Sequence, residues 1–156
     1  MIRRCSHLLV LALAVLAVAC SDDPPGPGAV VCGVLPLPLT GAAAGPVLVD
    51  IGLEVQSTGI VAVATATDPQ GSDNIDGVLQ TIGVFPDANC AGAAIPIQDD
   101  LAGSGVEETF GTVVDAVANP SLYNAIAGAT HWPVTVDFQD RDGNHTTGRV
   151  LAEVRP

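Results

Sequence analysis

The chain has 156 residues, about the size of one domain, and 17 Asp and Glu residues against five Arg and no Lys give a formal charge of −12. Proteins that bind nucleic acid or anionic lipid electrostatically neutralise phosphates with Lys and Arg, so this composition excludes both functions. The 17 Gly and 12 Pro residues argue against long helices. Only 14% of the residues are charged and 48% are hydrophobic, which is typical of a folded chain.

The N-terminal residues have the pattern of a secretion signal. Arg3 and Arg4 give a positive start, and residues 8–18 are an unbroken apolar run of eleven residues. This run is too short to span about 30 Å of hydrocarbon as a helix, but its length is typical of a signal-peptide core. We therefore predict that residues 1–19 are a signal peptide. Without them, three arginines face the same 17 acidic residues, and the charge becomes −14.

The apolar run ends in the letters LAVAC at residues 16–20, which resemble the lipobox of bacterial lipoproteins. In that family the cysteine becomes the new N-terminus and carries several acyl chains, which anchor a protein stably where a single chain binds only marginally. The resemblance implies a lipid anchor on Cys20 and an extracytoplasmic location. Ser21 follows where aspartate often marks inner-membrane retention, which implies the outer membrane. The alternative is an ordinary secretory signal with an incidental Cys20.

Two of the four cysteines remain once Cys5, in the predicted signal, and Cys20 are set aside. Cys32 and Cys90 are an even pair in an oxidising compartment, and we expect one disulfide between them. It would close a loop of nearly sixty residues, which in the chain-entropy model stabilises the fold by about 4 kcal/mol. The alternative is two independent buried thiols. A metal site is disfavoured because neither cysteine has a His or a second Cys at ligand spacing.

After a Pro- and Gly-rich tether at residues 20–29, residues 30–156 are expected to form one all-β domain. Apolar and polar residues alternate with period two between turn residues, and in the first run every second residue from Val47 to Val55 is expected to face the core. The fourth run carries Pro96, which favours a sheet edge. The pattern predicts strands at residues 47–56, 60–67, 78–85, 93–98, 106–113, 132–139 and 147–154.

One segment departs from the strand pattern. Asn119 is typical of a helix N-cap, Pro120 suits the first helical position, and Gly128 can end a helix. We expect one or two helical turns crossing between strands.

The few aromatic residues of the predicted strands fall at inward positions. A core role is expected for Phe85, Phe110, Trp132 and Phe138. The alternative for Trp132 is an exposed platform on which a sugar ring stacks.

Three stretches of the sequence carry a resemblance to a known fold family: ATATDPQGSDNIDGV, IQDDLAGSG and WPVTVDFQDRDGNHTTGRV. They are similar to turn motifs of bacterial extracellular immunoglobulin-like domains, and the resemblance covers residues 46–155. Together with the seven regular short strands, it implies an immunoglobulin-like β-sandwich of about seven strands with one short helical crossover. The family has no single activity, since its members act as spacers, adhesins, accessory domains or bodies of surface lipoproteins.

Acidic turn residues are the candidate metal ligands. Alternating oxygen ligands in a tight loop can hold calcium, which takes six to eight oxygens. One such loop has the spacing D-x-D-x-N and a second is acidic, which gives as candidate calcium ligands Asp140, Asp142, Asn144, Asp68, Asp73 and Asp76. The alternative is that Asp and Asn form these turns by bonding the local backbone, and the full EF-hand pattern is absent from the sequence.

Catalytic patterns are weak throughout the sequence. A nucleophilic site needs a serine held beside His131 or His145, and the serines lie in expected loops outside a G-x-S-x-G context. Glu107 and Glu108 are adjacent on an expected strand, so they point to opposite faces and cannot flank one glycosidic bond. We therefore expect a non-enzymatic structural or protein-interaction module without a cofactor. The alternative is a calcium-dependent adhesion or glycan-binding domain, and the protein or glycan partner is unknown.

Overall fold

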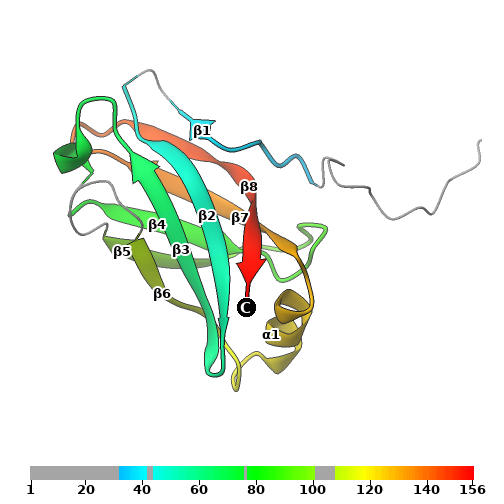
Figure 1. The fold of residues 1–156 in the computed structure, drawn as a ribbon. Helices are drawn as coiled ribbons and strands as arrows, with labels where there is room; N and C mark the ends of the chain where they lie inside the picture. Colours follow the sequence, from blue (N-terminus) through cyan, green and yellow to red (C-terminus); the bar gives the residue numbers. More distant parts are fainter. Residues whose placement is uncertain (1–31, 42–43, 76, 101–107) are drawn as a thin grey trace, which may run out of the picture.

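A computed structural model describes residues 32–41, 44–75, 77–100 and 108–156 of the chain (Figure 1). The predicted signal peptide, the tether, Cys20 and Asp76 lie outside the described residues. The lipid anchor therefore stays a prediction.

Strands dominate the described part, which also holds one α-helix and one short 3₁₀ helix. In chain order the elements are β1 (Leu39–Thr40), β2 (Val47–Gln56), β3 (Gly59–Thr67), η1 (Ser72–Asn74), β4 (Leu79–Val84), β5 (Ile95–Asp100), β6 (Glu108–Asp115), α1 (Pro120–Ala127), β7 (His131–Gln139) and β8 (His145–Arg155). Each predicted strand overlaps one of these elements. The two-residue strand β1 was not predicted, because it follows leucines that alternate with prolines and give no recognisable strand run.

The strands form one continuous sheet with the order β5-β4-β7-β8-β2-β3-β6, and β1 adds to β2. Every pairing is antiparallel except that of β2 with β8, which is parallel. The two end strands, β5 and β6, approach each other, and a Cβ built on Gly111 would lie 3.4 Å from Ile97 Cδ1. The sheet is therefore barrel-like, as Figure 1 shows. The all-β prediction with one short helix is confirmed, and the edge position of β5 is too.

A bulge in β2 corrects the predicted inward face of that strand. The register with β3 shifts between Leu48 and Asp50, so Val49 is an extra residue. Val49 is 42% exposed, whereas Leu48 is fully buried. The simple alternation from Val47 to Val55 is therefore wrong at its start, and it holds only after the bulge, where Ile51 and Leu53 are buried.

The aromatic residues fill the interior as predicted. Phe110 and Phe138 are fully buried and meet edge to face, with ring centroids 6.2 Å apart. Trp132 is 5% exposed, and its indole Nε1 donates a hydrogen bond to the Phe85 carbonyl oxygen at 2.8 Å. Trp132 is therefore a core residue and offers no exposed ring for a sugar.

The helix α1 begins with Pro120 at its first turn and ends at Ala127, with Gly128 at its C-cap as predicted. Asn119 occupies the N-cap position as predicted, and its carbonyl oxygen accepts from Tyr123 N at 3.0 Å, but its side chain makes no capping bond. The side chain of Asp115 orders this turn instead, because its Oδ1 accepts hydrogen bonds from the backbone N–H groups of Val117 and Ala118, both at 2.8 Å. These two bonds lower the pKa of Asp115. Among the described residues, no helix has the length and apolar character needed to cross a membrane.

Candidate functional site

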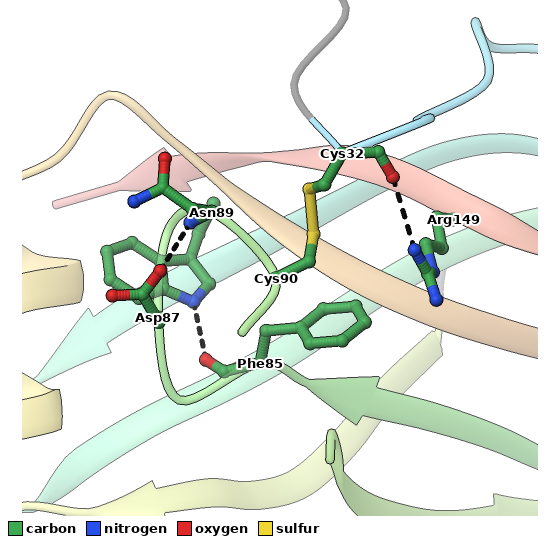
Figure 2. Close-up of a disulfide and its surroundings, with 7 residues drawn as sticks. Cys32, Phe85, Asp87, Asn89, Cys90 and Arg149 are labelled. Atoms are coloured by element: carbon green, nitrogen blue, oxygen red, sulfur yellow. Dashed lines mark hydrogen bonds between the residues drawn. A yellow bond between two sulfur atoms is a disulfide. The ribbon is translucent and has the colours of Figure 1, made fainter. Parts of the chain in front are cut away.

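The predicted disulfide between Cys32 and Cys90 is present (Figure 2). Its cysteines are 58 residues apart in sequence. Cys32 is the first described residue, and Cys90 lies in the loop between β4 and β5. The bond therefore joins the segment that precedes β1 to the loop that connects β4 with β5.

The loop that carries Cys90 is held by a local turn. Asp87 Oδ1 accepts a hydrogen bond from Asn89 N at 2.7 Å, and the Asp87 carbonyl oxygen accepts one from Cys90 N at 3.0 Å. Both cysteines have left-handed backbone conformations, with φ of 58° at Cys90 and 48° at Cys32. Non-glycine residues adopt such values rarely, so the surrounding contacts fix both cysteines in place.

Arg149 of β8 connects the disulfide region to the rest of the sheet. Its guanidinium lies 5.4 Å from the centre of the Phe85 ring, and its Nη1 donates to the Cys32 carbonyl oxygen at 3.3 Å (Figure 2). Its own carbonyl oxygen accepts a hydrogen bond from Leu35 N at 2.7 Å. Sequence reasoning missed this arginine because no local pattern marks a cation that contacts residues so distant in sequence.

Residues 32–41, which we call the N-terminal strap, lie between β2 and β8 where these two strands do not pair with each other. These two strands pair over only three residue pairs, Gly52 to Glu54 with Glu153 to Arg155. Beyond them, the strap bonds to β8 through Leu35 and to β2 through β1. A Cβ built on Gly148 would lie 2.9 Å from Leu39 Cδ2, so the Leu39 side chain packs closely over this glycine.

Arg155 reinforces the parallel pairing with a side chain that reaches across from β8 to β2. Its Nη2 donates to Asp50 Oδ2 at 2.6 Å, and its Nε donates to Glu153 Oε2 at 3.0 Å. The hydrogen bond to Asp50 and then that to Glu153 raise the pKa of Arg155. The guanidinium lies over Gly52, which has no side chain to obstruct it.

The first acidic loop joins β7 to β8. Asp140 is 1% exposed, and both its oxygens are occupied: Oδ1 accepts from Asn144 N at 2.8 Å and Oδ2 from Asn144 Nδ2 at 2.7 Å. Burial raises the pKa of Asp140, but these bonds and those from the Asp142 and Gly143 backbone outweigh it, so the pKa is lowered. Asp142 is exposed. These contacts support the turn-forming interpretation of D-x-D-x-N.

The second acidic loop lies beside the first, because Arg141 N donates to the Asn74 carbonyl oxygen at 2.8 Å. Asp68 Oδ1 accepts from Gln70 N at 2.7 Å, while its Oδ2 is buried and has no hydrogen-bond partner among the described residues. Asp73 is exposed. The described residues include no group of three or more His, Cys, Asp or Glu side chains placed to hold a metal. The calcium site stays a prediction.

An imidazole–carboxylate pair crosses from β8 to β7. His145 Nδ1 lies 2.7 Å from Asp137 Oδ1, with side chains 46% and 47% exposed. The sequence placed His145 in a loop, whereas it begins β8 and pairs with Gln139. The pair links two neighbouring strands at the surface. His131 begins β7, and its Nδ1 contacts Thr130 Oγ1 at 3.2 Å.

Comparison of the chain with protein-family models, with curated proteins and with solved structures gave no match.

Proposed function

We propose that this protein is a lipoprotein of the bacterial cell envelope, anchored through lipid on Cys20, whose β domain is a non-enzymatic structural or protein-interaction module. The observation that carries the proposal is the disulfide between Cys32 and Cys90. Disulfides persist in oxidising compartments outside the cytosol, which fits export by a signal peptide. Because two cysteines are paired and Cys5 falls in the predicted signal, Cys20 is the cysteine left to carry the lipid.

We further propose that the domain is immunoglobulin-like. Support comes from the turn motifs of the sequence and from the β7–β8 hairpin, which forms where the motif D-x-D-G-N predicts it.

The module interpretation is supported by polar side chains that form hydrogen bonds within the fold. Asp140, Asp115 and Asp87 accept hydrogen bonds within their own turns, and Arg155 joins two strands. These contacts build a scaffold, and a protein or glycan partner would bind on its surface.

The lipid anchor is tested by replacing Cys20. In the producing bacterium, wild-type protein is expected in the membrane fraction with fatty acid bound, detected by intact mass and by incorporation of a labelled fatty acid. Cys20→Ser is expected to lose both the lipid and the membrane association. Cys5→Ser is the matched control and keeps both. Lipid that survives Cys20→Ser, or its absence from wild-type protein, would contradict the proposal.

The alternative is calcium-dependent adhesion or glycan binding. The observation in its favour is Asp68 Oδ2, a buried carboxylate oxygen without a hydrogen-bond partner among the described residues, in the second acidic loop, which contacts the first. A thermal melt of the protein with calcium and then with chelator distinguishes the two functions. A ligand that binds only the native state raises stability by about 2.7 kcal/mol at a hundredfold excess over its dissociation constant. A rise that Asp68→Asn abolishes would support the alternative, and equal melts would remove it.

A further inference from the structure

We propose that the Cys32–Cys90 disulfide is a mechanical clamp, which passes tension on the chain before Cys32 directly to the β4–β5 loop and keeps the N-terminal strap seated. The use of such a clamp in the cell rests on the proposed anchor at Cys20. Its mechanics do not, so the two proposals can fail separately.

The strap is weakly held without the disulfide. Its strand β1 makes only two residue pairs with β2, Leu39 with Leu48 and Thr40 with Val47. Among the described residues, the strap is also held by the bond from Leu35 N to the Arg149 carbonyl oxygen and by the bond from Arg149 Nη1 to the Cys32 carbonyl oxygen. Each hydrogen bond stabilises a fold by only about 1 kcal/mol. A pull from the N-terminal side loads these bonds one after another, so the strap would leave before the sheet unfolds.

Loss of the strap would open the core. Leu39 is 5% exposed and belongs to the main cluster of buried residues, where it lies against Gly148. Its departure would expose this part of the interior to water. It would also leave β2 and β8 joined by their three parallel residue pairs and by Arg155. The strap is thus a small element whose release weakens the closure of the whole sheet.

The disulfide transmits the same tension to Cys90, which follows a strand that is paired more extensively than the strap. Cys90 follows β4, which is paired on both sides, with β5 over six residue pairs and with β7 over four. The end of β4 is fixed further by Phe85, whose carbonyl oxygen accepts the buried bond from Trp132 Nε1 and whose N donates to Pro133. Tension that enters at Cys90 therefore meets a strand held by ladders on both edges.

The clamp is tested by pulling single molecules in an optical trap, with the protein as purified held by handles at its two ends. Oxidised molecules are expected to show no early extension. After reductant is added to the same molecules, the strap is expected to peel first. Residues 32–40 would then give an early gain of contour length of about 30 Å at a force below that of the main unfolding step.

Each trace reports its own redox state. The oxidised disulfide locks a loop of 58 residues, so complete unfolding of an oxidised molecule is about 190 Å shorter than that of a reduced one. Cys32→Ser with Cys90→Ser is expected to behave as the reduced wild type. Should that variant fail to fold, reduction of the wild type in the trap still decides the question.

Two further variants separate clamping from general weakening. In reduced molecules Leu39→Ala is expected to lower the force of the early step, because this leucine seats the strap in the core. In oxidised molecules Leu39→Ala is expected to produce no early step. Val117→Ala, at an 89% exposed position in the β6–α1 turn, is the control and should leave both traces unchanged. An early step in oxidised wild type, or a single unfolding step at equal force in both redox states, would overturn the proposal.

Discussion

Gln80 is a buried polar residue whose replacement tests how β4 and β7 are joined. Its side chain is fully buried, and it bonds the backbone of Gln139 twice. Its Nε2 donates to the Gln139 carbonyl oxygen at 2.8 Å, and its Oε1 accepts from Gln139 N at 2.6 Å. A third bond runs from Nε2 to the Val78 carbonyl oxygen at 3.0 Å. The amide thus supplies both a donor and an acceptor where the β4–β7 ladder has ended.

The change Gln80→Leu keeps the approximate volume but leaves the Gln139 N–H and C=O without partners. A buried polar group that loses its partner costs about 1–3 kcal/mol, and the added apolar burial offsets part of the loss. We expect Gln80→Leu to lower the free energy of unfolding by about 2–4 kcal/mol. For a domain of this size, such a loss corresponds to a fall in the melting temperature of roughly 10 °C.

Urea unfolding of wild type and variant measures the loss, with Gln98→Leu as the matched control. Gln98 lies on the adjacent strand β5 and is exposed, and its side chain donates to Thr81 Oγ1 at 3.0 Å. Removal of an exposed hydrogen bond is expected to change stability by less than about 0.5 kcal/mol. If both variants lose the same stability, the bonds of Gln80 to Gln139 do not stabilise the fold and the reasoning is refuted.

Four other measurements test the remaining interactions. Removal of both disulfide cysteines is expected to lower the free energy of unfolding by about 4 kcal/mol, and chemical denaturation of wild type with and without reductant should show a similar loss. Trp132→Phe leaves the buried Phe85 carbonyl oxygen without its donor and should lower stability by about 1–3 kcal/mol, whereas unchanged unfolding would speak against a core role. The pKa of Asp140 is lowered, so its contribution is present above the ordinary value of 3.8 and is lost as pH falls through the folded value. Asp140→Asn should therefore reduce the drop in stability between pH 7 and pH 3, with the exposed Asp142→Asn as a control that keeps the drop. Calcium is expected to leave the melting temperature unchanged, because both Asp140 oxygens already accept hydrogen bonds, and a clear rise would contradict the turn-forming interpretation.

Strand positions could be predicted because alternation and turn residues are local signals. The inward faces could be predicted only where the strands are regular. In β2 the bulge at Val49 depends on pairing with β3, which period-two alternation cannot show. In β4, Leu79 is 54% exposed and Gln80 is fully buried, which reverses the expectation from hydrophobicity. That reversal follows from the backbone of Gln139, a residue 59 positions away, which lies beyond the β4–β7 ladder and bonds the Gln80 side chain instead.

The candidate site likewise contains one feature that the sequence predicts and one that it does not. The disulfide could be predicted by counting cysteines, since the predicted signal and the lipobox leave only one pair. The position of the strap could not be predicted, because the residues that contact it are distant in sequence. Gly148 leaves the space for Leu39, and Arg149 holds Cys32 and Leu35. Contacts of this range follow from the order of strands in the sheet, and no motif in the sequence specifies that order.

The parallel pairing of β2 with β8 explains why these contacts gather in one region. An antiparallel sheet can be extended by hairpins, but β2 and β8 come from opposite ends of the domain and meet over only three residue pairs. Arg155 supplements the pairing through its ion pair with Asp50, and the strap lies between the two strands farther along, beside Leu48 of β2 and Arg149 of β8. Both supplements come from the ends of the domain, where fraying is easiest. A covalent bond at Cys32 therefore acts at the point where fraying would begin. In a protein tethered by its N-terminus, tension from the anchor would then pass through the same bond that protects the strand closure.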